Sequence, residues 1–297
     1  MRYIELVPGI RSSVIGFGCA SVGGAKSPKE SARAIAMALD LGINHFDLAR
    51  SYGYGTAEAI VGRVLRGRRD AVVIATKFGI EATLAASLFR TLKPLVRVAK
   101  SIVNADKREL GGQQHPSPSR VGPNLLLRRT DLSAAAMIRS LEQSLRALGT
   151  DRVECLFIHE PTGKLGHVGE LLMAFQRLRS AGKVRAFGLA TPYMGLSQHA
   201  NYAGQFEVLQ FDCSPGCKHY HDAIGTRSDG ANVIFSPLRT PSSEAPAARL
   251  GRLIADFPRS VVLCSMFQEQ HIRENAGAAG LEAQTFPGAA QMISARV

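Results

Sequence analysis

Apolar and polar positions alternate along the chain with two different periodicities. Short apolar runs bounded by glycine or polar residues are typical of buried strands, and longer segments with apolar residues every three or four positions are typical of amphipathic helices. The predicted strands cover residues 13–17, 44–47, 72–76, 155–159, 186–190, 208–211, 233–235 and 261–264. The predicted helices cover residues 28–41, 57–65, 133–148 and 168–181, and three of them are followed by Gly42, Gly149 and Gly182.

Strands that alternate with helices indicate βα units and a parallel sheet. Eight strands are the number in a (β/α)8 TIM barrel, a fold of roughly 250 residues, so a chain of 297 residues is long enough to form one. The sequence therefore predicts an α/β fold in which residues 1–297 form a single barrel domain. Ahead of the first barrel strand, residues 3–7 and 12–16 flank Pro8-Gly9 and predict an N-terminal β-hairpin that closes the barrel floor.

Two stretches interrupt the alternation. Residues 80–129, after the third strand, form a long insertion in which an apolar and basic helical segment, 88–103, leads into a loop rich in Gly, Pro and Ser at 111–120. We expect this insertion to be a functional lid or a disordered excursion. Residues 239–248 read as a surface linker before one helix at 249–257.

The composition, 45% hydrophobic and 20% charged, excludes a disordered chain. A formal net charge of +12 is compatible with nucleic acid, an anionic membrane or a phosphorylated ligand as partner. The sequence contains no aromatic stacking motif or reading helix, and no run of about 18 uncharged apolar residues. We therefore expect neither nucleic acid nor membrane as a partner, and interpret the charge as a solvated basic shell.

The location of the protein is predicted from its N-terminus and its cysteines. Charged Arg2 and Glu5 interrupt the apolar start, which makes a secretory signal unexpected. The five cysteines are odd in number and scattered, so they predict no disulfide framework. Together these features favour a cytoplasmic protein.

Polar residues end three of the predicted strands or follow them directly. Asp47, Lys77 and His159 each close an apolar run, and Tyr52 follows Asp47 in a glycine-rich turn. Any one of them alone is more often a solvated surface group, but a barrel gathers the carboxyl ends of its strands at the active site. An ammonium beside a phenol lowers the pKa of the phenol, so Lys77 is expected to activate Tyr52. Asp47 would hold Lys77, and His159 would bind the substrate oxygen, which together suit acid-base chemistry on a carbonyl or alcohol.

The segments that carry these residues resemble the aldo-keto reductase family. The matching motifs are residues 42–53 with Asp47 and Tyr52, Ala75-Thr-Lys77-Phe-Gly, Leu156-Phe-Ile-His159-Glu-Pro, and segments 183–189 and 261–275. The resemblance implies a barrel enzyme that uses NAD(P)(H). Tyr52 would be its general acid/base, Lys77 would lower the pKa of Tyr52, Asp47 would support Lys77, and His159 would orient the carbonyl. Hydride would pass between the nicotinamide and the carbonyl carbon.

The same resemblance implies a cofactor-binding set. Gln210 would bind the nicotinamide carboxamide and Phe235 would stack on its ring. The remaining positions expected to contact cofactor are Thr191, Ser236, Leu238, Ser265, Met266, His271, Glu274 and Asn275.

Two departures from the family pattern affect this set. Ala190-Thr191 stands where the family usually has Ser-Asn to hold the carboxamide. Ser265 and His271 stand where basic residues usually bind the 2′-phosphate of NADP, although Arg273 or Arg239 can substitute for them. NADP(H) is expected ahead of NAD(H), and the preference is left open.

A second cluster of reactive side chains lies after the strand that contains Gln210. Cys213, Cys217, His219 and His221 are zinc-ligand types within nine residues, but their spacing is not that of a standard zinc finger. A polar loop that touches substrate is the favoured interpretation, so no metal is expected.

These observations leave two functions open. The first is an oxidoreductase that interconverts a small aldehyde, ketone or sugar with its alcohol. The second is a cofactor-binding regulatory subunit with little turnover. The loops that select the substrate contain no recognisable sequence motif, so the substrate is left open. The oligomeric state is open as well.

Overall fold

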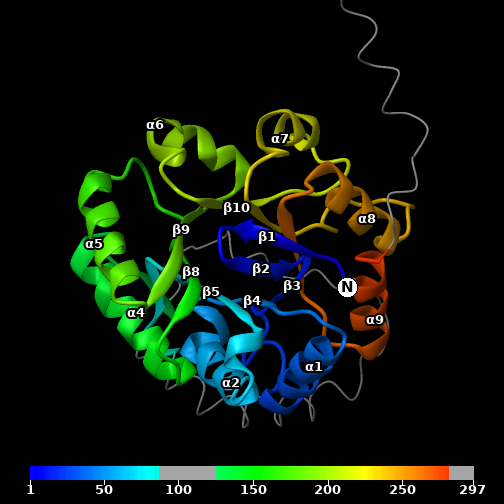
Figure 1. Cartoon of the computed structure of the whole chain (residues 1–297), viewed down its shortest axis with the longest axis horizontal. Coiled ribbons are helices and arrows are strands. Elements are labelled where there is room, and N and C mark those ends of the chain that lie inside the picture. Colours follow the sequence, from blue (N-terminus) through cyan, green and yellow to red (C-terminus); the bar gives the residue numbers. More distant parts are fainter. Residues whose placement is uncertain (84, 87–124, 281–297) are drawn as a thin grey trace, which may run out of the picture.

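The computed structural model describes residues 1–83, 85–86 and 125–280. Within them, eight parallel strands close into a barrel in the order β3-β4-β5-β8-β9-β10-β11-β12 (Figure 1). Their bounds are β3 Ile15–Gly18, β4 His45–Asp47, β5 Val73–Phe78, β8 Val153–His159, β9 Val184–Ala190, β10 Val208–Asp212, β11 Asn232–Phe235 and β12 Ser260–Cys264. The predicted (β/α)8 barrel is confirmed.

Helices surround the barrel on its outside (Figure 1). They are α1 Pro28–Asp40, α2 Ala57–Val64, α4 Ala134–Leu148, α5 Val168–Ser180, α6 Ala200–Ala203, α7 Tyr220–Arg227, α8 Pro246–Asp256 and α9 Glu269–Ala278. The α1 helix starts with a capping box between Ser27 and Glu30, and α4 ends on Gly149 at φ 67°, a left-handed conformation that glycine adopts without strain.

The eight barrel strands and the first four helices lie within two residues of their predicted bounds. The helix expected at 249–257 begins three residues earlier, because Pro246 provides a favourable first helical position. Among the described helices, three have no counterpart in the prediction: α6, α7 and α9. They are short, and each buries at most three residues, so their apolar pattern is weak.

The barrel interior is filled by every second residue of its strands. Val73 and Ala75 on β5 lie in the same buried cluster as Cys155 and Phe157 on β8. Because side chains alternate across a strand, the next inward positions are Lys77 on β5 and His159 on β8. Gly188 on β9 provides space for Phe157, since a Cβ there would lie 2.4 Å from the phenyl ring.

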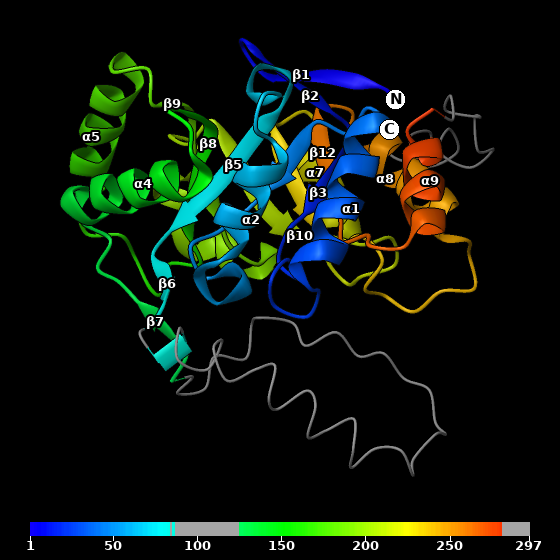
Figure 2. The ribbon, with the colours of Figure 1, turned by 90° about the horizontal axis from the view of Figure 1, so that it is seen from below.

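The N-terminal hairpin closes one end of the barrel, as predicted, but its second strand begins at Ile10 and not at residue 12, because Val7 pairs with Ile10 directly across the Pro8-Gly9 turn. It consists of β1 Tyr3–Val7 and β2 Ile10–Ser13, which pair antiparallel and lie across the barrel opening (Figures 1 and 2). Leu6 and Ile10 are fully buried in the same cluster as the interior of the barrel. The opposite end, where the barrel strands finish, therefore remains for the functional site.

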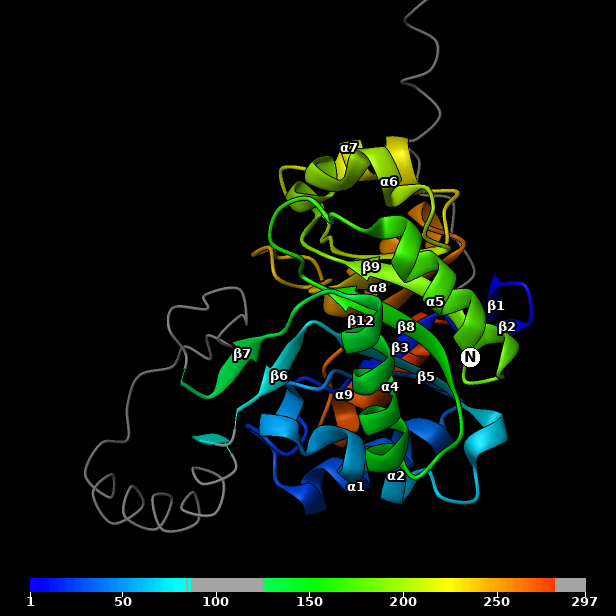
Figure 3. The ribbon, with the colours of Figure 1, turned by 90° about the vertical axis from the view of Figure 1, so that its left-hand side faces the viewer.

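A second small sheet stands at that opposite end. Strands β6 Ile80–Ala82 and β7 Leu127–Arg129 pair antiparallel and extend away from the barrel (Figures 2 and 3). They are the two ends of the predicted insertion. The helical segment expected at 88–103 and the loop at 111–120 lie outside the described residues, as does the chain after residue 280. Within the described ranges, no helix has both the length and the apolar character needed to cross a membrane.

Candidate active site

Four of the predicted site residues occupy the last or nearly last inward positions of their strands. Asp47 ends β4, Lys77 precedes the final residue of β5, and His159 ends β8. Gln210 lies in the middle of β10, two residues before its end. All four side chains are at most 8% exposed, so they form the inner wall of the barrel mouth.

Tyr52 reaches the same place from a short 3-10 turn, Tyr52–Gly55, that follows β4. The turn bends sharply because Gly53 and Tyr54 have φ values of 58° and 54°. At Gly53 a Cβ would lie 2.2 Å from the carbonyl oxygen of Val22, so only glycine fits. The glycines next to Tyr52 in the sequence thus allow the turn that aims its ring at the barrel mouth.

Lys77 and Asp47 form a buried ion pair at the centre of the site. The Lys77 Nζ donates to both carboxylate oxygens of Asp47, at 2.7 and 2.6 Å, and to the carbonyl oxygen of Leu48 at 2.8 Å. An ammonium group has three N–H donors, and these three acceptors use all of them. The predicted support of Lys77 by Asp47 is therefore present, and Leu48 completes it through a backbone atom that no side-chain motif reveals.

Gln210 is hydrogen-bonded to the same carboxylate. Its Nε2 donates to Asp47 Oδ1 at 3.0 Å, which joins β10 to β4 across the barrel. Its Oε1 is buried and has no hydrogen-bond partner among the described residues. A buried acceptor without a partner is costly, so this oxygen is a candidate contact for a bound ligand.

Tyr52 lies over the ion pair and beside His159. The Lys77 Nζ is 5.0 Å from the centroid of the Tyr52 ring, within the range of a cation–π contact. The His159 ring meets Tyr52 edge-on, with 6.1 Å between centroids and an angle of 85°. The structure therefore brings together Asp47, Tyr52, Lys77 and His159, as the sequence predicted.

The expected effect of Lys77 on Tyr52 is wrong in this structure. Burial raises the pKa of the Tyr52 phenol well above 10, and the charges of Asp47, Glu160 and Cys19 raise it further. The main physical reason is the burial of the phenol. The close ion pair adds to it, because the Lys77 N–H groups donate to Asp47 and the Asp47 charge offsets that of the ammonium beside the phenol. Tyr52 is thus held as a protonated phenol.

The pKa of His159 is shifted in the opposite direction, which keeps its imidazole neutral. Burial lowers its pKa well below 6.5, and the positive charges of Lys77 and Arg129 lower it further. Its Nδ1 is buried without a partner among the described residues. A neutral imidazole at this place can form a hydrogen bond with an oxygen without competing with Tyr52 as the acid.

Sequence reasoning missed two charged residues next to this group. Glu160 directly follows His159 and has a φ of 45°, an unusual value for a residue with a side chain. Arg129, at the end of β7, donates to the Glu160 carbonyl oxygen and lies 3.9 Å from its carboxylate. The pair links the insertion to the site. The position of Glu160 just after a strand-end histidine was the available signal, whereas Arg129 is distant in sequence and carried none.

The residues expected to bind cofactor are more dispersed than the catalytic group. Thr191 follows β9 and is buried, and Phe235 ends β11 at the barrel mouth. Ser236 comes next and has a φ of 57°, a strained value for serine. Leu238 is half-buried two residues later. These four positions lie at or just after the ends of β9 and β11, the strands on either side of β10. Their contact with a cofactor stays a prediction.

The other expected cofactor positions lie after β12. Met266 is buried and accepts a hydrogen bond from Asn275 Nδ2 at 3.5 Å, whereas Ser265 and His271 are exposed. Glu274 is exposed as well and accepts from Gln270 at 2.8 Å. No described hydrogen bond or ion pair joins this group to the catalytic residues.

Both arginines named as substitutes for a 2′-phosphate site are engaged elsewhere. Arg273 forms an ion pair with Glu269 at 3.0 Å, one turn earlier on the exposed side of α9. Arg239 lies 3.3 Å from Asp212 and donates to Ser236 Oγ at 2.9 Å. Arg239 therefore sits beside the loop after β11, and Arg273 alone lies on α9 near His271.

The sequence matches the model of the aldo/keto reductase family over residues 14–215, and the chain belongs to this family. It is 28% identical to pyridoxal 4-dehydrogenase of Microbacterium luteolum over 222 residues, 69% of this chain and 58% of that protein. It is 29% identical to D-threo-aldose 1-dehydrogenase of a Pseudomonas species over 192 residues, 62% of this chain and 51% of that protein. The chain thus spans about half the length of these curated relatives.

Solved structures show the same fold over nearly the whole chain. The holo form of an aldo-keto reductase from Bacillus halodurans has a TM-score of 0.69 at 20% identity and covers 95% of this chain and 92% of its own. An aldo-keto reductase from Klebsiella pneumoniae in complex with NADPH has a TM-score of 0.61 at 17% identity, with coverage of 94% and 90%.

Proposed function

We propose that the protein is an NAD(P)(H)-dependent oxidoreductase that interconverts a small carbonyl compound and its alcohol. The observation that carries this proposal is the group at the barrel mouth, in which Tyr52 and His159 meet above the buried Lys77–Asp47 pair. A protonated phenol next to a neutral imidazole is a proton donor next to a hydrogen-bonding group. A carbonyl oxygen that becomes an alcohol needs both.

The buried polar atoms of the site fit a nicotinamide. Its carboxamide carries two N–H donors and one carbonyl acceptor, and the partnerless Oε1 of Gln210 is an acceptor for such a donor. Phe235, Thr191 and the backbone after β11 surround the same strand ends and are proposed as further contacts. When bound, the nicotinamide supplies or takes up the hydride.

In the reducing direction, the residues of this chain handle the proton. His159 binds the carbonyl oxygen and holds it next to Tyr52. The Tyr52 Oη donates its proton to that oxygen as negative charge develops there. Lys77 lies under the Tyr52 ring, where Asp47 and Leu48 hold it through three hydrogen bonds. Gln210 in turn donates a hydrogen bond to Asp47. Lys77 and Asp47 are therefore proposed to position Tyr52.

We propose NADP(H) ahead of NAD(H) as the cofactor. Support comes from the NADPH complex of the Klebsiella protein and from the exposed position of His271 and Arg273 on α9, where a phosphate would be accessible. The relatives named for pyridoxal and for an aldose support an aldehyde or a sugar as substrate. The five free thiols support a reducing, cytoplasmic setting.

The Tyr52→Phe variant tests the proposal. We expect turnover on a panel of aldehydes, ketones and sugars to fall by roughly 100-fold or more, the usual contribution of a positioned acid, while the Kd for NADPH stays within about twofold. Tyr54→Phe, two residues away in the same turn, is the matched control and should keep full turnover. A parent protein that binds the dinucleotide but turns over nothing on the panel would contradict the proposal and favour the regulatory subunit.

A further inference from the structure

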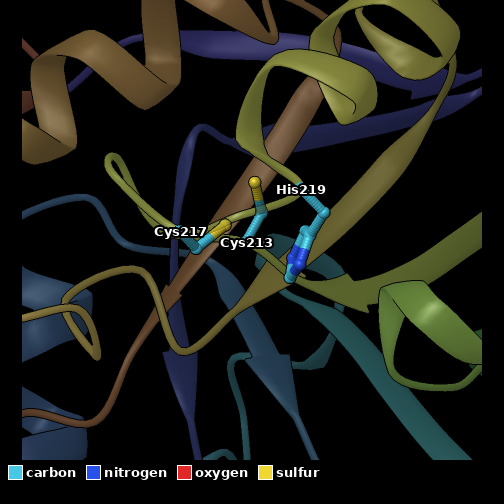
Figure 4. Close-up of side chains that lie close together, drawn as sticks. All are labelled: Cys213, Cys217 and His219. Atoms are coloured by element: carbon cyan, nitrogen blue, oxygen red, sulfur yellow. The ribbon is translucent and has the colours of Figure 1, made fainter.

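Three side chains with metal-binding atoms meet in the loop between β10 and α7. The two sulfur atoms of Cys213 and Cys217 and a ring nitrogen of His219 all lie within 4.8 Å of one another (Figure 4). In a tetrahedral zinc site with Zn–S bonds of about 2.3 Å, two ligand atoms are about 3.8 Å apart. The observed group is therefore within about 1 Å of the spacing that an ion requires.

The loop backbone creates this arrangement through two successive turns. The Cys217 N–H donates to the Ser214 carbonyl oxygen at 2.9 Å, and the Tyr220 N–H donates to the Cys217 carbonyl oxygen at 3.0 Å. Gly216 has a φ of 83°, a conformation in which a side chain is strained. These turns fold residues separated by four and two positions back onto one another, which a linear reading of the spacing does not reveal.

His219 is prepared as a ligand by its neighbours. Its Nε2 donates to the Asp212 carbonyl oxygen at 2.9 Å, because a carbonyl oxygen can only accept. The Nδ1 of a neutral ring then keeps its lone pair. The ring also stacks on Tyr193, with 4.8 Å between centroids and an angle of 9°, and the Tyr193 hydroxyl is anchored on Asp222 at 2.6 Å. Such outer contacts are what fix the ring nitrogen of a metal-binding histidine.

We propose that Cys213, Cys217 and His219 bind one zinc ion. Two sulfurs and one imidazole suit zinc, whereas calcium and magnesium prefer oxygen ligands. Three protein ligands leave the fourth tetrahedral position for water or another small ligand. The expectation of a polar loop without metal rested on the unusual spacing along the chain, and the folded geometry outweighs it.

The two cysteines bring different properties to the ion. Cys213 is 2% exposed, and like any cysteine that binds zinc it gives up its thiol proton when the ion binds. Cys217 is half-buried and gives the ion a route from solvent. A bound ion would tie the loop that follows Gln210 to the end of β10, next to the candidate active site. The zinc site does not depend on the proposed reductase activity.

Zinc binding is tested on untagged full-length protein kept reduced, stripped with a chelator and reloaded with zinc chloride. We expect about one equivalent of zinc after desalting, and a cobalt-substituted form with the thiolate-to-cobalt charge-transfer absorption of a tetrahedral site. Cys217→Ser and His219→Ala should each weaken zinc affinity at least about 100-fold, since loss of outer contacts alone costs 10–100-fold. Competition with a chromophoric chelator measures this.

Two matched controls show whether the effect is specific. Cys264→Ala removes a buried thiol from β12, and His167→Ala removes an exposed imidazole before α5; both should bind zinc like the parent. Far-UV circular dichroism confirms that each variant is folded, and the half-buried position of Cys217 makes its serine variant the safer of the ligand variants. Absence of bound zinc in the parent, or equal affinity in the parent and the folded ligand variants, overturns the proposal.

Discussion

Removal of Lys77 should destabilise the protein much more than removal of an ordinary surface lysine. Lys77 and Asp47 are each 2% exposed, and their charges lie 2.6 Å apart. The substitution Lys77→Met keeps the length of the side chain but leaves the Asp47 carboxylate buried, with Gln210 Nε2 as the remaining side-chain donor described for it. Loss of one partner from a buried ion pair costs about 3–5 kcal/mol of folding free energy.

The double variant Asp47→Asn/Lys77→Met separates charge from packing. It removes both charges, so it should recover most of the loss seen in Lys77→Met, because buried pairs replaced as a unit are often close to neutral. Lys26→Met is the matched control. Lys26 lies 4.0 Å from Glu30, and the two side chains are 35% and 55% exposed. A solvent-accessible pair of this kind contributes at most about 1 kcal/mol.

Urea unfolding followed by far-UV circular dichroism at pH 7 measures all four proteins. We expect a large loss of free energy of unfolding for Lys77→Met, a small loss for Lys26→Met, and an intermediate value for the double variant that lies nearer to the parent. A loss for Lys77→Met no larger than that for Lys26→Met would refute this role of the buried ion pair. A double variant as unstable as Lys77→Met would refute it as well.

Three further predictions concern groups at the barrel centre. Because the pKa of Tyr52 lies above 10, carbonyl reduction should be independent of pH between 6 and 9 while alcohol oxidation still rises at pH 10; a reductive decline between pH 7 and 9 would contradict this. Burial, and to a lesser degree Lys77, lowers the pKa of His45 to about 3. As the pH falls, the unfolded state therefore takes up a proton on His45 at a higher pH than the folded state does. The free energy of unfolding should fall by about 3 kcal/mol between pH 7 and 4.5. His45→Gln, which cannot titrate, should remove most of that fall in urea titrations at the two pH values. Gln210→Leu should weaken NADPH binding about 3- to 10-fold, the value of one net hydrogen bond, as measured by nicotinamide fluorescence; unchanged affinity would remove Gln210 from the cofactor site.

Much of the barrel and its central group was predictable because local patterns agree with the fold. The apolar runs that end at Asp47 and His159 are buried barrel strands, and period-two alternation places the polar residue that ends each run inside the mouth. The glycines after Tyr52 signalled the turn that carries it. For these residues, position on a strand was enough to predict proximity.

The protonation of the site and the zinc ligand group depend on three-dimensional detail. The Lys77 ammonium was expected to lower the pKa of Tyr52, but its N–H groups donate hydrogen bonds to Asp47 and to the backbone oxygen of Leu48. No sequence motif encodes the contact with Leu48. Cys217 and His219 meet only because two turns fold the loop back. In both cases the outcome rests on distances of a few ångströms that sequence spacing does not fix.

Transfer of deuterium from a dinucleotide labelled at the nicotinamide C4 tests the central claim most directly. The parent protein, incubated with labelled NADPH and a panel of small aldehydes, ketones and sugars, should give an alcohol that carries deuterium on the former carbonyl carbon. Tyr52→Phe should bind the same dinucleotide and form little of that product. If the parent binds the dinucleotide and no substrate of the panel acquires deuterium, the protein is not the carbonyl-reducing enzyme that its barrel mouth indicates.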